Sequence, residues 1–233
     1  MNTDVALFIP VKKYSTRVEN KNFKPFYKTS NLLEIKLRQA LRLFSSESVI
    51  VTTDSEEALQ IADHFGVRSQ FIPALSHFEW NESVKALASE CHKPFLCIYR
   101  ATTPFLDEHS LNHFLDHFFS DDDSDSALTV LKIQERLFNS KFRPLNFSIG
   151  AGHLDSQDTP PIYKEVCGIS IISKELATSY AYHYGKKPKL VMVDQLHGID
   201  INTEEEWQMA QVLTEIPSFS NSLQNTTESP IKS

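Results

Sequence analysis

The stretch Val5-Ala6-Leu7-Phe8-Ile9-Pro10-Val11-Lys12-Lys13-Tyr14-Ser15-Thr16-Arg17 places a basic loop directly after a short apolar run. Residues 5–9 are apolar without alternation, which predicts a strand buried on both faces. In open sheets of alternating strands and helices, ligands bind at the loops that follow the carboxyl ends of the strands. The loop that begins at Pro10 is therefore a candidate ligand-binding loop.

Positive charge is concentrated in this loop, which also carries the small hydrogen-bonding residues Ser15 and Asn22. Its cationic side chains are Lys12, Lys13, Arg17 and Lys21. The whole chain has a formal net charge of −7, which argues against general binding to nucleic acid or to a membrane surface. A cationic cluster in an acidic protein instead suggests a bound polyanion, most simply a nucleoside triphosphate. A solvated, lysine-rich surface loop is the alternative.

Glycine is scarce, and its distribution excludes two common nucleotide-binding loops. The chain has 6 glycines, and none precedes Gly66. A Rossmann dinucleotide loop or a Walker loop needs glycine where the backbone meets phosphate. Any phosphate binding by the first loop must therefore rely mainly on side chains.

The rest of the chain alternates strand patterns with helix patterns. Further strands are predicted over 48–52, 67–72, 95–99, 127–133, 168–173 and 189–193. Helices are predicted over 31–44, 54–65, 83–91, 107–119, 176–184 and 203–213, with capping boxes at the first and last of these. The alternation predicts a three-layer α/β fold of Rossmann-like type, with a mainly parallel sheet and helices on both faces.

Composition and length predict one globular domain. At 233 residues and 41% hydrophobic content the chain can bury a sizeable core. We assign residues 1–214 to this domain, with 134–165 as an insertion and 215–233 as a disordered tail. Three widely spaced cysteines, no signal peptide and no long apolar run predict a cytoplasmic protein.

Several ordered segments resemble the acylneuraminate cytidylyltransferase family, the CMP-sialic acid synthetases and their relatives. The first family motif has counterparts in Pro10-Val11-Lys12, Tyr14-Ser15-Thr16-Arg17 and Lys21-Asn22. Further counterparts are Val51-Thr52-Thr53-Asp54-Ser55, Arg100-Ala101-Thr102-Thr103-Pro104-Phe105-Leu106, Gln157-Asp158, Pro161-Ile162-Tyr163-Lys164-Glu165 and Gly198-Ile199-Asp200-Ile201-Asn202-Thr203-Glu204. They follow the family order and span roughly residues 5 to 213.

The resemblance implies a nucleotidyltransferase fold and a Mg²⁺-dependent reaction. A nonulosonic acid, a sialic-acid-like sugar, would receive CMP from CTP, and pyrophosphate would leave, for surface polysaccharide assembly. The resemblance also implies a homodimer in which the insertion reaches into the partner's site. Neither nucleic acid nor membrane is an expected partner.

Site roles follow from the matched motifs and from the chemistry of the residues. The expected nucleotide-binding residues are Lys12, Ser15, Arg17, Lys21, Asn22 and Arg100. The expected catalytic residues are Lys21, Arg17 and Asp200, and the expected metal ligands are Asp200 and Asn202. The expected substrate-binding residues are Arg100, Gln157, Tyr163 and Lys164.

Departures from the family pattern leave two alternatives open. Lys12 stands where the family has arginine, Thr16 where it has lysine, Tyr14 where it commonly has glycine, Arg100 where it has glutamine, and Asn202 where it has a second aspartate. A non-catalytic homologue that binds a nucleotide or a sugar nucleotide is one alternative. A metal-dependent glycosyltransferase that uses residues 200–202 as a degenerate Asp-x-Asp motif is the other.

Two further patterns have competing interpretations. His109, His113 and His117 have the spacing of metal ligands on a helix, but they lie opposite an apolar stripe and are predicted to face solvent. Asp54 is either a helix cap or a ligand to nucleotide or metal.

Overall fold

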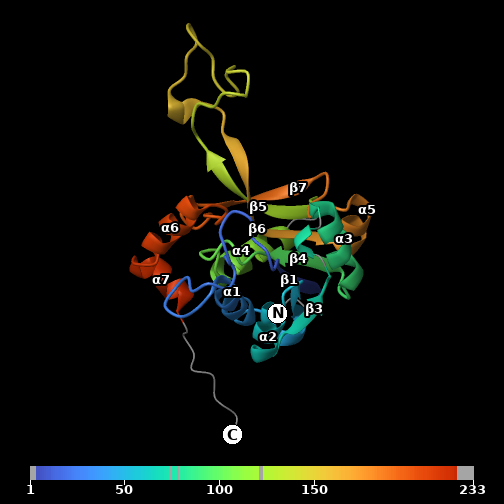
Figure 1. Ribbon diagram of the computed structural model, residues 1–233. Coiled ribbons are helices and arrows are strands. Elements are labelled where there is room, and N and C mark those ends of the chain that lie inside the picture. The colour runs from blue at the N-terminus through green and yellow to red at the C-terminus, as the bar shows by residue number, and fades with distance from the viewer. Residues whose placement is uncertain (1–3, 74, 78, 121–122, 225–233) are drawn as a thin grey trace.

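The computed structural model describes residues 4–73, 75–77, 79–120 and 123–224. Its centre is a seven-stranded sheet with the order β3-β2-β1-β4-β6-β5-β7 (Figure 1). The strands are β1 (Val5–Val11), β2 (Val49–Thr53), β3 (Arg68–Phe71), β4 (Phe95–Tyr99), β5 (Ser126–Ile133), β6 (Ile162–Ser173) and β7 (Pro188–Val193). All of the predicted strands are present.

The sheet is mainly parallel, as predicted, with β6 as the antiparallel strand. β1 pairs in parallel with β2 and β4, and β2 pairs in parallel with β3. β6 runs antiparallel to both β4 and β5, whereas β5 and β7 are parallel. The carboxyl ends of β1, β2 and β4 therefore lie at one edge of the sheet, where ligands bind in folds of this class.

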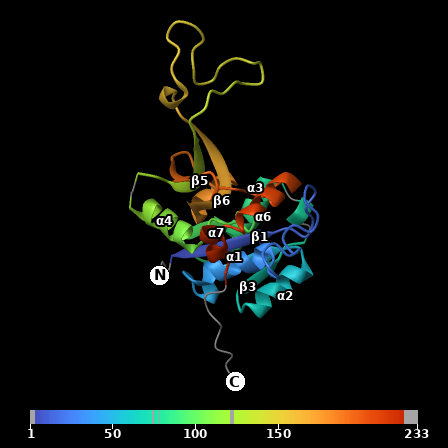
Figure 2. The ribbon, with the colours of Figure 1, turned by 90° about the vertical axis from the view of Figure 1, so that its left-hand side faces the viewer.

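Helices cover both faces of the sheet (Figures 1 and 2). One core cluster joins the sheet to residues of α1 (Leu32–Leu41), α2 (Glu56–His64), α4 (Glu108–Phe119), α6 (Glu204–Leu213) and α7 (Pro217–Leu223). The other joins it to α3 (Trp80–Glu90) and α5 (Lys174–Tyr180). Short 3₁₀ helices cover Ser46–Ser48, Leu75–His77 and Ser156–Asp158.

The apolar run of β1 supplies both cores, because successive side chains of a strand point to opposite faces. Leu7 and Ile9 belong to the first cluster, and Phe8 belongs to the second. Both faces of β1 are therefore buried, as its unbroken hydrophobic pattern predicted. The basic loop begins where this strand leaves the core.

A buried polar network fixes the loop between β4 and α4. The fully buried ammonium of Lys36 donates to the carbonyl oxygens of Thr103 and Leu106 at 2.9 and 2.8 Å. Gln39 donates to the carbonyl of Pro104 at 2.8 Å, and the Tyr99 hydroxyl donates to that of Leu106 at 2.6 Å. Buried carbonyl groups need such partners, so α1 holds this loop in one conformation.

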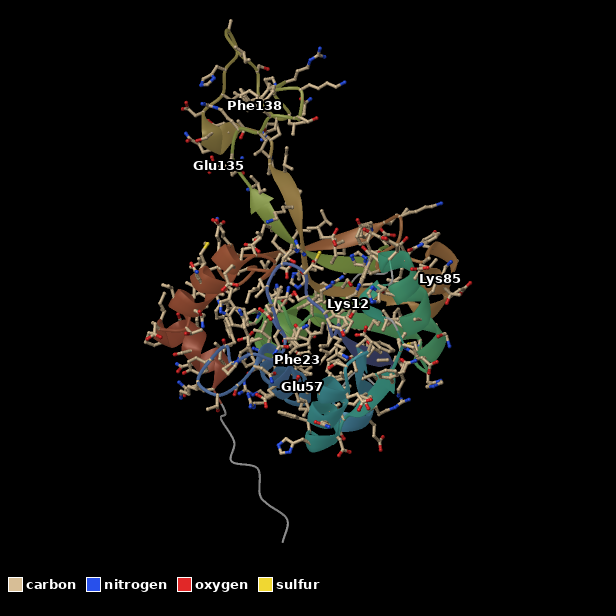
Figure 3. The ribbon with its side chains drawn as sticks, in the orientation of Figure 1. Lys12, Phe23, Glu57, Lys85, Glu135 and Phe138 are labelled. Carbon is tan, nitrogen blue, oxygen red and sulfur yellow. The ribbon has the colours of Figure 1, made fainter. Side chains whose placement is uncertain are left out.

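The predicted insertion forms an arm that projects from the body between β5 and β6 (Figures 1 and 2). Figure 3 shows Glu135 and Phe138 on this arm, away from Lys12 in the body. Asn146 joins its two sides by donating to the carbonyl oxygens of Glu135 and Pro160 at 2.7 and 3.0 Å. The arm is thus held by its own hydrogen bonds.

Three predicted boundaries need correction. Residues 217–223 form α7 instead of belonging to a disordered tail, because Phe219 and Leu223 pack into the core. Residues 225–233 of that predicted tail lie outside the described residues. Helix α3 begins at Trp80 instead of 83, because Glu79 and Glu82 form a capping box. Strand β6 begins at 162 instead of 168, because it pairs with β5 along the base of the arm.

Across the described residues, no helix has the length and hydropathy that a membrane crossing requires.

Candidate active site

A cavity of about 420 Å³ lies beside the first loop and the ends of β1 and β4. Its walls come from five parts of the chain: the loop after β1, helix α3 with the segment before it, the loop after β4, strand β6, and the segment before α6. Eight of the predicted site residues line it: Lys12, Ser15, Arg17, Lys21, Asn22, Arg100, Asp200 and Asn202. Their roles remain predictions, but the structure brings them together.

The first loop is held by backbone hydrogen bonds to Asp54. The two carboxylate oxygens of Asp54 accept from the backbone amides of Lys13 and Ser76, each at 2.7 Å. Burial of this carboxyl opposes ionisation, but the hydrogen bonds from Ser76 and Lys13 together lower its pKa. The cap of α2 is Ser55, so Asp54 is not a helix cap. Asp54 instead shapes a loop that has no glycine.

Lys21 and Arg17 connect this loop to the segment before α6. The Lys21 ammonium, only 8% exposed, donates to the carbonyl oxygen of Ile201 at 2.5 Å. Burial lowers the pKa of Lys21, and the nearby Asp200 carboxylate opposes that shift. Arg17 donates to the side-chain oxygen of Asn202 at 2.8 Å. Two cations of the first loop therefore contact the segment that carries the Asp200 carboxylate.

Asp200 is oriented by hydrogen bonds from both sides. Its Oδ1 accepts from the Thr102 hydroxyl at 2.6 Å, and its Oδ2 accepts from the Asn202 amide at 2.7 Å. The backbone amide of Ile201 donates to the carbonyl of Thr102 at 2.9 Å. Lys36 holds the Thr102 loop through its hydrogen bonds to Thr103 and Leu106. This loop in turn fixes the position of Asp200.

The donor set fits a magnesium ion only if the substrate supplies most of its ligands. No group of three or more His, Cys, Asp or Glu side chains suited to a metal occurs among the described residues. The amide oxygen of Asn202 already accepts from Arg17, which leaves Asp200 as the main ligand. Mg²⁺ is commonly bound by one or two carboxylates together with phosphate oxygens and water. A triphosphate beside Asp200 satisfies that requirement.

Arg100 also lines the cavity, stacked on an aromatic ring. Its guanidinium carbon is 4.0 Å from the centre of the Trp80 ring, and both residues line the cavity. Arg100 belongs to the loop fixed by Lys36, and its backbone amide donates to the carbonyl of Gly168 on β6 at 2.9 Å. A Cβ atom at Gly168 would lie 2.3 Å from the Leu106 side chain, so a larger residue there would force that buried side chain to move.

Three predicted substrate-binding residues lie outside this cavity. Gln157 is in the arm, and Tyr163 and Lys164 are on the part of β6 that leads into it. All three side chains are exposed to solvent. Within one chain, the structure does not bring them to the cationic groups.

Several cavity residues were not predicted from the sequence. They are Leu75, Ser76, Trp80, Ser83, Leu87, Thr102 and Cys167. Thr102 had a usable signal, because it follows a buried strand at the same sheet edge as Lys12. Trp80 and Ser83 had no such signal, because they lie in helix α3 and do not directly follow a strand. Only tertiary packing brings them to the cavity.

The three histidines of α4 face solvent, as predicted. His109, His113 and His117 are exposed, and the rings of His113 and His117 lie with their centroids 4.0 Å apart, tilted by 52°. They lie away from the cavity described above, and no metal role follows from them.

Three solved structures that are similar to this chain in fold carry names that refer to cytidine nucleotides. A CMP:2-keto-3-deoxy-manno-octonic acid synthetase, solved in complex with CTP, is 14% identical with a TM-score of 0.69, covering 91% of this chain and 99% of the other. A 4-diphosphocytidyl-2C-methyl-D-erythritol synthase from Anaerococcus prevotii is 14% identical with a TM-score of 0.63, covering 91% and 98%. A cytidylyltransferase from Leptospira borgpetersenii is 16% identical with a TM-score of 0.56, covering 96% and 98%.

These likenesses establish the α/β nucleotidyltransferase-like fold. A comparison with curated proteins found no match. A family model described as cytidylyltransferase, however, matches residues 6–195, a range that contains the first loop, the Arg100 loop and all of the sheet except Val5. With most of the chain matched and the cationic cavity inside that fold, the protein belongs to the cytidylyltransferase family.

Proposed function

We propose that this protein transfers CMP from CTP to the anomeric hydroxyl of a nonulosonic acid and releases pyrophosphate. The observation that carries the proposal is the single cavity in which Lys12, Arg17, Lys21 and Arg100 line the walls together with Asp200. Four cations around one carboxylate suit a substrate pair that brings a triphosphate and a second anion. The similar structure solved with CTP supports the choice of nucleotide.

The triphosphate would lie along the first loop. Lys21 is buried at the side of the segment 200–202, and Lys12 and Arg17 line the same cavity. Transfer of this kind needs in-line positioning and neutralisation of charge more than covalent chemistry from the protein. The hydroxyl oxygen of the sugar forms a bond to the α-phosphorus while the bond to pyrophosphate breaks, and the hydroxyl proton goes to solvent. The three cations would stabilise the charge that develops on the phosphate oxygens.

Mg²⁺ would be held by Asp200 and by phosphate oxygens. When bound, it would neutralise phosphate charge and orient the triphosphate. Thr102 and Asn202 orient the carboxylate for this task by donating to its two oxygens.

The acid group of the sugar would bind to Arg100. Within the described residues, its guanidinium donates no hydrogen bond and forms no ion pair, and it stacks on Trp80. A guanidinium presents paired N–H groups that match a carboxylate. An acidic sugar therefore fits this part of the cavity better than a neutral one.

We further propose that the protein is a homodimer joined through the arm. The arm exposes large apolar side chains, among them Phe142 at 89% and Ile149 at 76% exposure, with Phe138 and Leu145 also exposed. Apolar groups on a projecting segment indicate a surface that another chain covers. Such a partner would also give Gln157, Tyr163 and Lys164 a site to reach.

The test is pyrophosphate release from CTP and Mg²⁺ with a panel of nonulosonic acids, using UTP in place of CTP as the matched control. We expect turnover with CTP and at least one acid, and much less with UTP. No turnover across the panel would contradict the proposal.

A non-catalytic nucleotide-binding role is the second candidate, favoured by one observation. The amide oxygen of Asn202 is occupied by Arg17, so it does not stand ready as the second metal ligand. If the wild type binds CTP without turnover and Asn202→Asp creates activity, the binding role is correct. Turnover by the wild type excludes it.

A further inference from the structure

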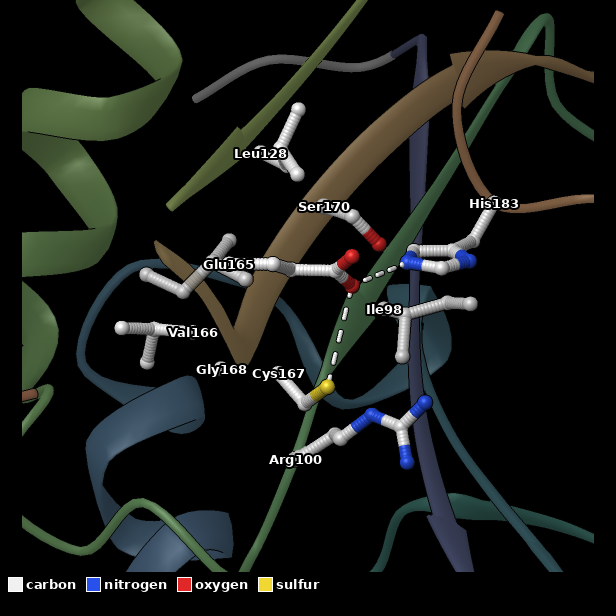
Figure 4. Close-up of a pocket in the computed structure, with 10 residues that line it drawn as sticks. Ile98, Arg100, Leu128, Glu165, Val166, Cys167, Gly168, Ser170 and His183 are labelled. Carbon is white, nitrogen blue, oxygen red and sulfur yellow. Dashed lines mark hydrogen bonds and ion pairs between the residues drawn. The ribbon is translucent and has the colours of Figure 1, made fainter. Parts of the chain in front are cut away.

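Trp80 is also part of a chain of part-buried polar contacts that the reaction proposed above does not use. Trp80 is the first residue of α3, and its indole Nε1 donates to His183 Nδ1 at 2.7 Å. His183 Nε2 lies 2.8 Å from the carboxylate of Glu165 on β6, and Figure 4 shows this contact beside Arg100. Arg100, Trp80, His183 and Glu165 come from four separate segments, so the fold assembles the chain.

The contacts fix the tautomer of His183. An indole N–H can only donate, so Nδ1 of His183 must accept and carries no proton. The neutral ring then carries its proton on Nε2 and donates it to Glu165. His183 is only 5% exposed, whereas Trp80 and Glu165 are half-buried, so water has only partial access to the two contacts. This hydrogen bond from His183 is the main cause of the lowered pKa of Glu165, which keeps the acceptor ionised.

The Cys167 thiol completes the end of the chain. It lies 3.7 Å from the same oxygen of Glu165, near Arg100 in Figure 4. Its side chain also lines the cavity described above. Burial raises the pKa of Cys167 to about 11, so this group stays a neutral thiol near neutral pH. It contributes a weak donor and no reactive thiolate.

The chain determines how the guanidinium of Arg100 is presented. A planar cation stacked on an indole has its N–H groups directed sideways from the stack. The direction of those groups therefore depends on the angle of the Trp80 ring, which the hydrogen bond to His183 fixes. An arginine without this support would sample many rotamers and lose affinity when it becomes ordered on a ligand.

We propose that Trp80, His183 and Glu165 are positioning residues that hold Arg100 as the carboxylate-binding group for the acceptor, and so set the preference for acidic sugars. This inference rests on the proposed function, because it specifies the acceptor end of the same cavity. It assigns roles to three residues that the sequence motifs did not mark for them.

The first test separates the acceptor from CTP. Trp80→Phe keeps an aromatic ring but removes the N–H donor, and His183→Phe removes both hydrogen bonds of the chain. We expect KM for the acceptor to rise by roughly 3- to 10-fold in each variant, with kcat and KM for CTP close to wild type. His183→Gln offers an amide with both an acceptor and a donor, and it should recover part of the loss. His109→Phe, on the exposed face of α4, is the matched control and should change nothing.

Two results would overturn the inference. One is an unchanged KM for the acceptor in His183→Phe. The other is an equal rise in KM for CTP and for the acceptor together with a lower Tm, since that pattern reports general damage to the fold.

A second measurement does not depend on turnover. The chain has two tryptophans, so Trp207→Phe leaves the indole N–H signal of Trp80 alone in a nitrogen–proton correlation spectrum. In that background we expect a hydrogen-bonded signal that moves when His183→Phe is added. N-acetylneuraminic acid or 2-keto-3-deoxy-manno-octonic acid should shift it, and their methyl esters should not.

The two readouts distinguish the proposals. Absence of pyrophosphate release in the wild type contradicts the proposed function. The Trp80 signal still decides whether Trp80, His183 and Glu165 are positioning residues. If neither acid moves that signal, or if the methyl esters move it equally, the positioning role of Trp80 is wrong.

Discussion

The cavity and the arm are two parts of the expected site that the fold treats differently. Lys12, Arg100 and Asp200 lie at loops that leave one sheet, and the structure brings them to one cavity. Tyr163 and Gln157 lie on an arm that projects from that sheet, with their side chains in solvent. The same family resemblance marked both sets, through different motifs.

The difference shows how a fold places functional residues. β1 and β4 are adjacent parallel strands, so Lys12 and Arg100, which follow them, are neighbours by geometry. Asp200 follows the edge strand β7 and reaches them through the hydrogen bonds of its segment to the Thr102 loop. The projecting arm is held by hydrogen bonds of its own, such as those of Asn146. We propose that a second copy of this chain covers its exposed apolar side chains.

The largest effect should come from the buried cation of the cavity. Lys21→Ala removes the ammonium that contacts the segment before α6, and we expect the rate of pyrophosphate release to fall by about 10²–10³. Lys13→Ala is the control, because Lys13 is an exposed cation of the same loop whose side chain does not line the cavity. An equal loss in both variants would mean that overall charge, and not the place of Lys21, controls the rate.

The arm gives the next largest effect. Ile149→Glu places a charge where an apolar side chain is 76% exposed. If the arm joins two copies, we expect the dissociation constant of the dimer to rise by roughly 10- to 100-fold. Light scattering across protein concentrations measures the change. Met209→Glu, on the exposed side of α6, is the control and should leave the mass unchanged. A wild type that stays monomeric at all concentrations would show that the arm does not join two copies.

Features that depend on local sequence could be predicted, whereas contacts between distant residues could not. The hydrophobic run of β1 and the capping boxes at Asn31 and Thr203 are local signals, and the structure has a strand and two capped helices there. The Trp80–His183 contact joins residues 103 positions apart, and no local pattern predicts it. Helix α7 was missed because its sequence is polar, while its burial depends on Phe219 reaching a core that other segments build.

A smaller effect should follow from a second carboxylate beside Asp200. Asn202→Asp removes the amide that donates to Asp200 at 2.7 Å and sets two like charges side by side. Repulsion should lower Tm in chelator, and Mg²⁺ should restore it with affinity raised roughly tenfold. Thermal melts over a magnesium titration measure both. Asn202→Ala loses the same hydrogen bond without adding charge, so a matching gain in that variant would show that the carboxylate does not bind the metal.

The smallest effect should be the pH dependence of Lys12. Burial lowers the pKa of Lys12, and Asp54 only partly opposes the shift. A lysine ammonium is present below its pKa and is lost as the pH rises through it. This charge therefore disappears at lower pH than it would on a solvated lysine, and kcat/KM for CTP should decline early on the alkaline side.

Lys12→Arg tests that assignment, because a guanidinium keeps its proton at any such pH. Near neutral pH both side chains are charged, so we expect activities within about 3-fold of each other. On the alkaline side the decline should move to higher pH but not vanish, since Lys21 also has a lowered pKa. Lys13→Arg should leave the profile as it is. If Lys12→Arg also leaves the profile unchanged, the alkaline decline belongs to Lys21 alone. Binding of the triphosphate then depends on the charge of Lys21 and not on that of Lys12.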